Sequence, residues 1–389
     1  MLRFSCLALI LITLGTKGQP LVNNFLNGRT TGPLIYMEYG PGDDRLGGAK
    51  ATYLDSNLLV RVTDSTKDDY IIRLSKNHLA YMPRTAVKRD TTTVVKPAYL
   101  SNNWRVYGDD KYDYVAISLD ERLPYKSVQQ IDPARIVVDI YGVTSNTNWI
   151  TQLSTVKEIR NSWYEQPEDD VFRVIIELNH KQHWGYSIFY EGNKMFIRVK
   201  RQPADLSLSK IHVAIDAGHG GDNTGADGTK TKISEKKYTL LIAKQLQETL
   251  ERENASVFMV RTKDTTLTMP ERWAMLKTDD PDFLISIHLN SSNYDTIQGV
   301  STYYRYIGFR PLTQFILDHM VQLGLKEHGN VGSFNFSLSG PTDFPNCLVE
   351  VAFLSNKYDE QLILDPEFHK AVACQITEGI KDWLRSLQQ

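Results

Sequence analysis

Two neighbouring segments decide the fold, IHVAIDAGHGG (211–221) and ISEKKYTLLIA (233–243). The first is a short apolar run that ends in glycines, which is typical of a buried strand followed by a tight turn. The second predicts a helix that begins near Ser234, because apolar residues recur in it at helical spacing. Its predicted buried stripe consists of Tyr238, Leu241, Ile242 and Leu246. A strand followed by a helix is the first half of a βαβ unit.

The rest of the C-terminal half repeats this alternation of strand and helix. Its strand-like runs are VFMV (257–260), FLISIH (283–288), GVSTYY (299–304) and CLVEVAF (347–353). Thr268, Pro270 and Glu271 predict a capped helix start, and Asp365 opens a last helix. The apolar face of that last helix consists of Phe368, Val372, Ile376, Ile380 and Trp383. The alternation predicts an α/β domain over residues 208–389, with a mostly parallel sheet flanked by helices.

Two small all-β domains are predicted before it. Residues 30–90 hold short strands and turns, among them LLVRV (58–62) and YIIRL (70–74), which favours an SH3-like β-barrel module. The polar segment 88–103 has no clear periodicity and is the predicted linker to the next domain.

Residues 104–202 contain a weak internal repeat. YVAISL (114–119) matches RVIIEL (173–178), and IVVDIYG (136–142) matches MFIRVK (195–200) at nearly the same offset. Two similar sets of strands predict two sheets packed face to face, although chance similarity between strand pairs also explains the match. The pattern resembles the AMIN domain, a β-sandwich module.

Composition narrows the classes of function. The chain has 389 residues, 44 of them basic and 46 acidic, which gives a formal net charge of −2. This length predicts two or three domains, and the charge argues against a nucleic-acid binder, which needs a surplus of Lys and Arg. Three cysteines cannot form a disulfide framework. Cys347 and Cys374 lie in apolar surroundings and are predicted to be buried core residues, with a bridge between them left open.

The first twenty residues predict the compartment. Arg3 precedes an apolar run from Cys6 to Leu14, and small and polar residues follow as far as Gly18. This is the layout of a secretory signal peptide over residues 1–18. The run is shorter than the roughly 20 apolar residues that span a bilayer. No membrane span is therefore expected in the mature chain, and a short anchor or a buried terminal helix is the alternative.

Four charged or titratable residues are candidates for a common site. In open α/β sheets, sites form at the carboxyl ends of strands, and His219 and His288 follow or close two predicted strands. Glu235 opens the first predicted helix. Glu350 lies inside CLVEVAF, where burying a charge is costly unless another group pairs with it. Each residue alone has a simple structural explanation, but the four together predict a site.

Smaller features allow more than one interpretation. Gly218, Gly220 and Gly221 either let the backbone approach a metal or substrate closely or form a tight turn. The other histidines of this half are expected to be structural, in the case of His212, or solvated, in the cases of His319, His328 and His369.

Five segments of the C-terminal half carry a family resemblance. They are IDAGHGGDNTGADG (215–228), ISEKKYTLLIA (233–243), VRTKDTTLTMPERWAM (260–275), FLISIHLNSS (283–292) and CLVEVAFLSNKYDEQLILDP (347–366). In order and spacing they resemble the zinc-dependent N-acetylmuramoyl-L-alanine amidases, over essentially all of residues 209–389. The resemblance implies that His219, Glu235 and His288 bind Zn²⁺ and that Glu350 is the catalytic acid/base.

The resemblance also implies an activity and a location. Such enzymes are peptidoglycan hydrolases that cleave the amide bond between N-acetylmuramic acid and L-alanine of the stem peptide, using a zinc-activated water. The AMIN resemblance implies anchoring to the cell wall or septum, a role in cell division, and a divisome or activator protein as a partner. The expected location is the periplasm or cell envelope of a bacterium.

Two alternatives to this function remain open. The same residues would suit another zinc-dependent cell-wall peptidase, and a wall-binding protein with an inert amidase-like domain is the non-catalytic alternative. Some related amidases carry an inhibitory helix before the final strand. The segment 306–345 holds one predicted amphipathic helix, about 311–325, and a short loop, so we expect an open catalytic domain.

Overall fold

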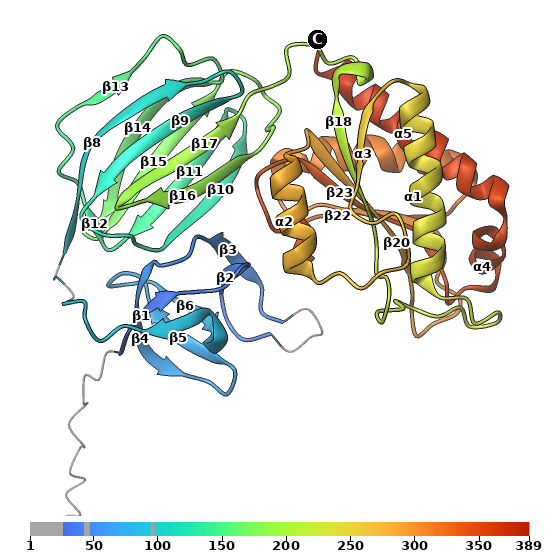
Figure 1. The fold of residues 1–389 in the computed structure, drawn as a ribbon, viewed down its shortest axis with the longest axis horizontal. Helices are drawn as coiled ribbons and strands as arrows, with labels where there is room; N and C mark the ends of the chain where they lie inside the picture. The colour runs from blue at the N-terminus through green and yellow to red at the C-terminus, as the bar shows by residue number, and fades with distance from the viewer. Residues whose placement is uncertain (1–25, 43–46, 95, 97, 389) are drawn as a thin grey trace, which may run out of the picture.

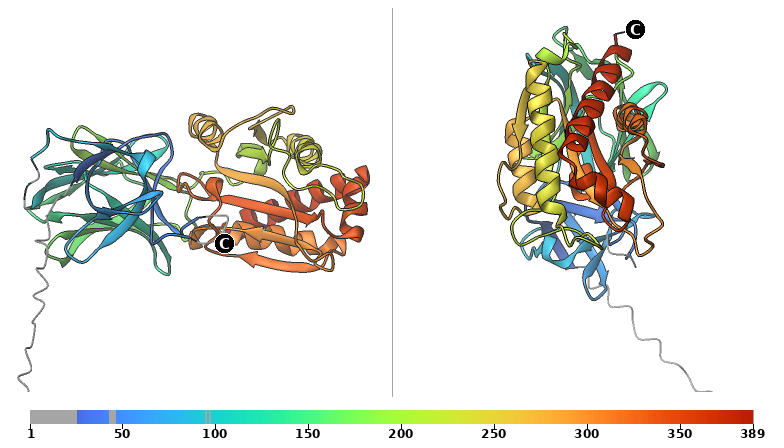
Figure 2. Two further views of the ribbon diagram at one scale, coloured as in Figure 1. Left: turned by 90° about the horizontal axis from the view of Figure 1, so that it is seen from below. Right: turned by 90° about the vertical axis from the view of Figure 1, so that its right-hand side faces the viewer.

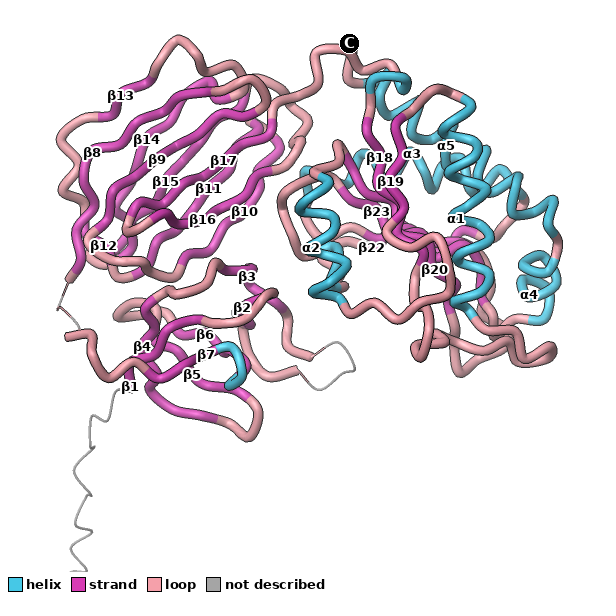
Figure 3. The backbone as a smooth tube through the Cα atoms, in the orientation of Figure 1, coloured by secondary structure: helices cyan, strands magenta, loops and turns pink. Residues whose placement is uncertain are grey.

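The computed structural model describes residues 26–42, 47–94, 96 and 98–388, which form three groups of elements in chain order (Figure 1). The predicted signal peptide, residues 1–18, lies outside the described residues. Within the described ranges, every α-helix belongs to the C-terminal group, and the short helical turn beside β7 is the 3-10 helix Arg84–Ala86 (Figure 3). In the same ranges, no helix has the length and apolar character needed to cross a membrane.

Seven strands form an antiparallel N-terminal sheet in the order β3-β2-β6-β5-β4-β1-β7. They are β1 (Leu26–Thr30), β2 (Ile35–Glu38), β3 (Lys50–Leu54), β4 (Leu59–Ser65), β5 (Asp69–Arg73), β6 (Leu79–Pro83) and β7 (Val87–Arg89). Val60 and Val62 of β4 pack with Ile72 of β5 in a small core. The region is built of strands, as predicted, and the SH3-like barrel remains a prediction.

Two sheets make up the second group. Their strands are β8 (Tyr99–Gly108), β9 (Tyr112–Leu119), β10 (Tyr125–Ile131), β11 (Ala134–Tyr141), β12 (Val143–Thr144), β13 (Ile150–Gln152), β14 (Ile159–Glu168), β15 (Val171–Leu178), β16 (Tyr186–Glu191) and β17 (Lys194–Lys200). One sheet has the order β10-β11-β15-β14, and the other has the order β12-β8-β9-β17-β16, with β13 also paired to β8. Strand β8 begins inside the predicted linker 88–103, which is therefore shorter than expected.

The two sheets share one hydrophobic core, to which Val115 of β9 and Val138 of β11 both contribute. Each sheet combines strands from both halves of the predicted repeat, because β9 pairs with β17 and β11 pairs with β15. Strand similarity along a sequence does not define pairing partners, so this exchange between the halves was not predictable from the repeat.

A six-stranded sheet forms the centre of the third group, in the order β19-β18-β20-β23-β21-β22. Its strands are β18 (His212–Ala217), β19 (Ser256–Met259), β20 (Phe283–Asn290), β21 (Val300–Tyr303), β22 (Glu327–Val331) and β23 (Asn346–Phe353). Strands β21 and β23 are antiparallel, and the other neighbouring pairs are parallel. This geometry brings the carboxyl ends of β18, β20 and β23 to one edge.

Helices cover both faces of this sheet (Figure 2). They are α1 (Glu235–Arg252), α2 (Met269–Asp279), α3 (Arg310–Met320), α4 (Lys357–Leu364) and α5 (Pro366–Ser386). Side chains alternate across a strand, and Val213 of β18 packs in the core of α1, α3 and α5, whereas Ala214 packs with Leu276 of α2. The predicted capping box is present, since Thr268 and Glu271 bond each other's backbone at the start of α2.

Three side-chain predictions for these helices have different outcomes. The predicted buried face of α5 is buried along its whole length, from Phe368 to Trp383. On α1, Leu241 is 39% exposed and does not belong to the buried stripe. Cys347 is buried, but Cys374 is exposed on the outer side of α5, so the prediction that both lie in the core is wrong for Cys374. Both thiols are free.

Candidate metal centre

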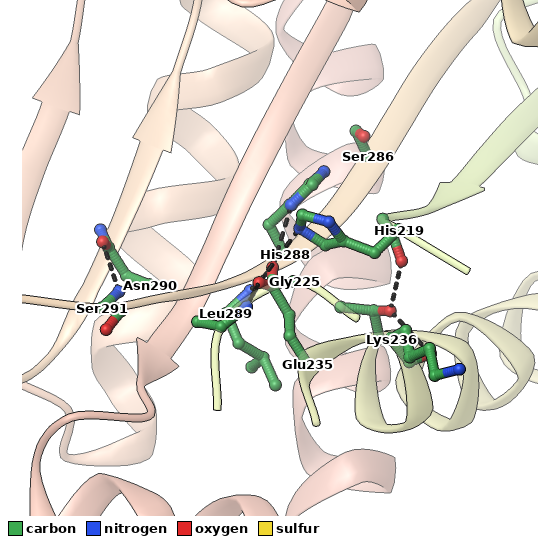
Figure 4. A network of polar contacts seen from close by, with 12 residues as sticks. His219, Gly225, Glu235, Lys236, Ser286, His288, Leu289, Asn290 and Ser291 are labelled. Carbon is green, nitrogen blue, oxygen red and sulfur yellow. Dashed lines mark hydrogen bonds and ion pairs between the residues drawn. The ribbon is translucent and has the colours of Figure 1, made fainter. Parts of the chain in front are cut away.

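His219, Glu235 and His288 meet at the carboxyl edge of the third sheet. His219 follows β18, Glu235 is the first residue of α1, and His288 lies near the end of β20, the parallel neighbour of β18. Their side chains point toward one another (Figure 4). One ligand atom from each lies within 4.8 Å of the others. The structure thus brings together three residues that are far apart in the chain.

The carboxylate of Glu235 joins the two imidazoles. Its Oε2 lies 3.0 Å from Nε2 of His219, and its Oε1 lies 3.0 Å from Nδ1 of His288. The backbone N–H groups of Ala226 and Leu289 donate to the same two oxygens, at 2.8 and 3.0 Å. In a tetrahedral zinc site with ligand distances of about 2.0–2.1 Å, ligand atoms lie about 3.3 Å apart. With one ligand atom from each residue within 4.8 Å of the others, the three side chains are close enough to bind one ion together.

An orphaned imidazole nitrogen provides a second indication of a ligand. His288 is 7% exposed, and its buried Nε2 has no hydrogen-bond partner within the described part of the chain. Buried polar atoms normally have a partner. Nδ1 of His219 lies 3.0 Å from Oδ1 of Asn223 and can donate to this amide oxygen, so Nε2 is the nitrogen that can give up its proton to bind a metal. Two imidazoles and one carboxylate are the donors of many catalytic zinc sites.

The electrostatics of the cluster favour an ionised carboxylate. Burial alone would raise the pKa of Glu235, which is 4% exposed, but hydrogen bonds with His219 and His288 hold this pKa well below its usual value. Burial would lower the pKa of His288, but its bond to Glu235 raises this pKa above the usual value. The negative charge at the centre of the cluster suits a cation.

Glu350 lies beside this cluster on the adjacent strand. It is half-buried in β23, and it is the register partner of His288 in β20. Its charge contributes to the raised pKa of His288. The four residues predicted from the sequence are therefore neighbours in the structure.

Two buried arginines that the sequence did not single out hold the loop that carries His219. Arg261 donates to the carbonyl oxygens of Ala217 and Gly218, each at 2.8 Å. Arg272 donates to the carbonyl of His219 and pairs with Asp216 at 2.5 Å. Fixed carbonyls help His219 to keep its left-handed backbone conformation, with φ of 61°. Both arginines lie in the segment 260–275, and no pattern in it indicates burial.

The glycines after β18 form the predicted tight turn, and a close approach of their backbone to a metal or substrate stays a prediction. A Cβ atom on Gly218 would lie 2.4–2.7 Å from ring atoms of His288, so the backbone lies close to this imidazole. Gly220 and Gly221 have φ of 130° and 58° and form the turn.

The remaining histidines of this half lie away from the cluster. His212 bonds Ser256 and Asp279 and is structural, as predicted. The prediction of a solvated side chain is wrong for His369, which is buried and bonds the carbonyl of Ile363, because it lies inside the packed start of α5. His319 is half-buried beside Asp382, and His328 is exposed.

Comparisons with known proteins identify two of the three groups. Residues 213–382 match the family model described as N-acetylmuramoyl-L-alanine amidase, and residues 103–199 match that of the AMIN domain. Among curated proteins, the chain is similar to the probable cell wall amidase LytH of Staphylococcus aureus, with 32% identity over 170 residues. The match covers 43% of this chain and 57% of LytH, so the chain spans little more than half the length of the curated relatives it matches.

Two solved structures are each similar to a part of the chain. One is an N-acetylmuramoyl-L-alanine amidase from Clostridium difficile 630, with 31% identity, 45% of this chain and 97% of that chain covered, and a TM-score of 0.44. The other is the catalytic domain of the amidase CwlV from Bacillus (Paenibacillus) polymyxa var. colistinus, with 30% identity, 45% and 98% coverage, and a TM-score of 0.43. From residue 213 to residue 382 the chain thus belongs to the N-acetylmuramoyl-L-alanine amidase family, and residues 103–199 form an AMIN domain.

Proposed function

We propose that this protein is a peptidoglycan hydrolase that cleaves the amide bond between N-acetylmuramic acid and L-alanine of the stem peptide. The observation that carries the proposal is the convergence of His219, Glu235 and His288 on one point at the edge of the sheet. The match of residues 213–382 to the amidase family supports the choice of bond.

We infer that these three side chains bind zinc. Zinc held there would supply polarisation of the substrate carbonyl and a lowered pKa of the attacking water. The chain's own residues prepare the site for it. Glu235 provides an ionised carboxylate, Asn223 offers an acceptor for Nδ1 of His219, and the buried arginines fix the backbone that carries this histidine.

Glu350 is proposed as the general base and acid. A carboxylate next to the metal centre can accept the proton of the attacking water and then donate it to the departing amine, which cannot leave as an anion. Its position on β23, in register with His288, fixes the backbone that carries the carboxylate. The rigid centre of the sheet thus holds the acid/base close to the ligands.

The domain organisation extends the proposal to the whole chain. We propose a signal peptide over residues 1–18, an SH3-like module over 30–90, an AMIN β-sandwich over 104–202 and the catalytic domain over 208–389. The AMIN match supports a location in the bacterial cell envelope, with peptidoglycan as the main partner. A divisome or activator protein is the proposed protein partner.

The test is the digestion of purified peptidoglycan with the full-length chain, followed by mass spectrometry of the products. We expect free stem peptides and intact glycan strands, loss of activity with a chelator, and recovery with zinc. Glu350→Gln is expected to lower the rate by about 10²–10⁴-fold. Glu251→Gln, an exposed residue of α1, is the matched control and should retain full activity.

Two other results would refute the proposal. Fragments cut within the stem peptide would indicate a peptidase. Equal release of products by the wild-type protein and Glu350→Gln would leave a wall-binding protein as the better description.

A further inference from the structure

The segment from Ser333 to Phe336, between β22 and β23, places alternate side chains against the sheet, and one of them reaches the metal centre. The ring of Phe336 lies 5.3 Å from the imidazole of His288, centroid to centroid, with the two planes at 80°. The ring of Phe334 lies 4.5 Å from that of Tyr303 in β21. The side chain between these two rings, Asn335, makes no such contact and bonds the N-terminal sheet instead.

Asn335 uses both ends of its amide group to bind the chain just before and within β3. Its Nδ2 donates to the carbonyl of Gly48 at 2.8 Å, and its Oδ1 accepts from the backbone N–H of Lys50 at 3.4 Å. Arg305 donates to the same Oδ1 at 2.9 Å and also to the carbonyl of Lys50. An amide bonded through both its oxygen and its nitrogen has a fixed orientation.

The chain beyond Phe336 is bound on both sides as well. Leu338 and Phe344 are buried in the core under α2. Thr342 exchanges two hydrogen bonds with Tyr186 of the AMIN domain, of 2.8 Å and 2.6 Å. Phe336 therefore cannot move far from His288 unless contacts with the β modules break.

Phe336 is one of several groups that hold the ring of His288, and the ring of His219 lies 4.9 Å from it, centroid to centroid. One side chain, Glu235, bonds its Nδ1, and the backbone of Gly218 lies against the ring. Residues that orient a metal ligand typically change metal affinity about 10–100-fold when they are removed.

We propose that Asn335 is a positioning residue: by binding the N-terminal sheet, it holds the ring of Phe336 against His288 and keeps this imidazole in place for the metal. The N-terminal module then acts on the metal centre itself, in addition to any role in wall attachment. The inference rests on the proposed metal site but is independent of the bond that the enzyme cleaves.

The test measures zinc affinity of the full-length protein by competition with a chromogenic chelator. Asn335→Ala and Phe336→Ala are each expected to weaken zinc binding by about tenfold, whereas Phe336→Tyr, which keeps the ring, stays close to wild type. The matched control is Asn77→Ala. Asn77 also lies in the N-terminal module, but it bonds Glu168 of β14 at 2.9 Å. Its replacement should leave zinc affinity unchanged.

The double variant Asn335→Ala/Phe336→Ala tests the route of the effect. If Asn335 acts through Phe336, the double variant binds zinc as weakly as Phe336→Ala, whereas independent effects would multiply to about a hundredfold loss. Unchanged or tighter zinc binding by Asn335→Ala, or a multiplied loss, overturns the proposal. Should Asn335→Ala fail to fold, Asn335→Ser is measured with the same expectation. Because no substrate is present, the outcome does not depend on the products released from peptidoglycan.

Discussion

Gly218 lies so close to His288 that the side chain of this proposed zinc ligand has little free space on that side. A Cβ atom at this position would lie 2.4 Å from Cε1 of His288 and 2.6 Å from its Nε2. The imidazole would have to move away from Glu235, with which it now makes a 3.0 Å contact. We expect Gly218→Ala to weaken zinc binding by at least about tenfold, because a displaced ligand loses its geometry. Chelator competition on the full-length protein measures the change.

The control for this variant is Gly40→Ala, where a Cβ atom would meet no other atom within 4 Å. It should bind zinc as the wild type does. If both variants bind zinc equally well, the contact between Gly218 and His288 is not needed for binding.

At the scale of elements, an ion pair joins α2 to the central strand β18. Arg272 and Asp216 are both 1% exposed, and Asp216 also accepts from the hydroxyl of Ser286 at 2.8 Å. Replacing Arg272 with Met leaves the carboxylate of Asp216 buried without its counter-charge, which typically costs about 3–5 kcal/mol. We therefore expect Arg272→Met to lower the midpoint of thermal unfolding by several degrees.

The double variant Asp216→Asn/Arg272→Met also removes the buried carboxylate that Arg272→Met leaves unpaired. Its thermal midpoint should therefore lie above that of Arg272→Met. A thermal midpoint of Arg272→Met equal to that of the wild type would show that the pair adds little to stability. A double variant less stable than Arg272→Met would show that Asp216 stabilises the fold through other groups.

Prediction from the sequence succeeded where an element carries its own local signal. The apolar runs at 283–288 and 347–353 became β20 and β23, and the Thr268–Glu271 cap became the start of α2. Strand β22 was missed because its sequence, EHGNV, has a single apolar residue and depends on pairing with β21.

The site shows the same division between local and tertiary signals. The resemblance of short segments pointed to His219, Glu235, His288 and Glu350, which the fold brings together. Arg261 was not predictable, because its partners are backbone carbonyls that only the tertiary fold brings near it. The contact of Phe336 with His288 was missed for the same reason.

At the scale of the whole molecule, a cavity of about 250 Å³ lies where all three groups of elements meet. Tyr53 of the N-terminal sheet, Phe189 of the AMIN domain and Trp273 of α2 line it together with Asp343. Burial raises the pKa of Asp343 to about 6, and the charge of Lys277 offsets this only in part.

This pKa predicts a stability that depends on pH. Between the usual pKa of 3.8 and about 6, the folded protein holds a proton on Asp343 that the unfolded chain has lost. The contribution of Asp343 to the free energy of unfolding is therefore fully present below pH 3.8. It decreases by at most about 3 kcal/mol as the pH rises from 3.8 through 6. Asp343→Asn has no such pH-dependent loss of stability. The thermal midpoint of the variant minus that of the wild type should therefore be larger at pH 7 than at pH 4.

Thermal melts of both proteins at these two pH values measure the difference. A difference that is the same at both values would mean that Asp343 has an ordinary pKa in the folded protein. Arg198, Lys200 and Asp280 also act on this carboxyl, and the variant removes their interactions with its charge.

The exchange of strands between the halves of the AMIN domain has a consequence for its assembly. A nascent chain that ends after β12 holds β9 without β17 and β11 without β15, so both strands expose an unsatisfied edge. Such long-range pairing slows folding, because distant segments must meet before any sheet can close. We therefore expect a stop or cut between the halves of the domain to leave a fragment that aggregates.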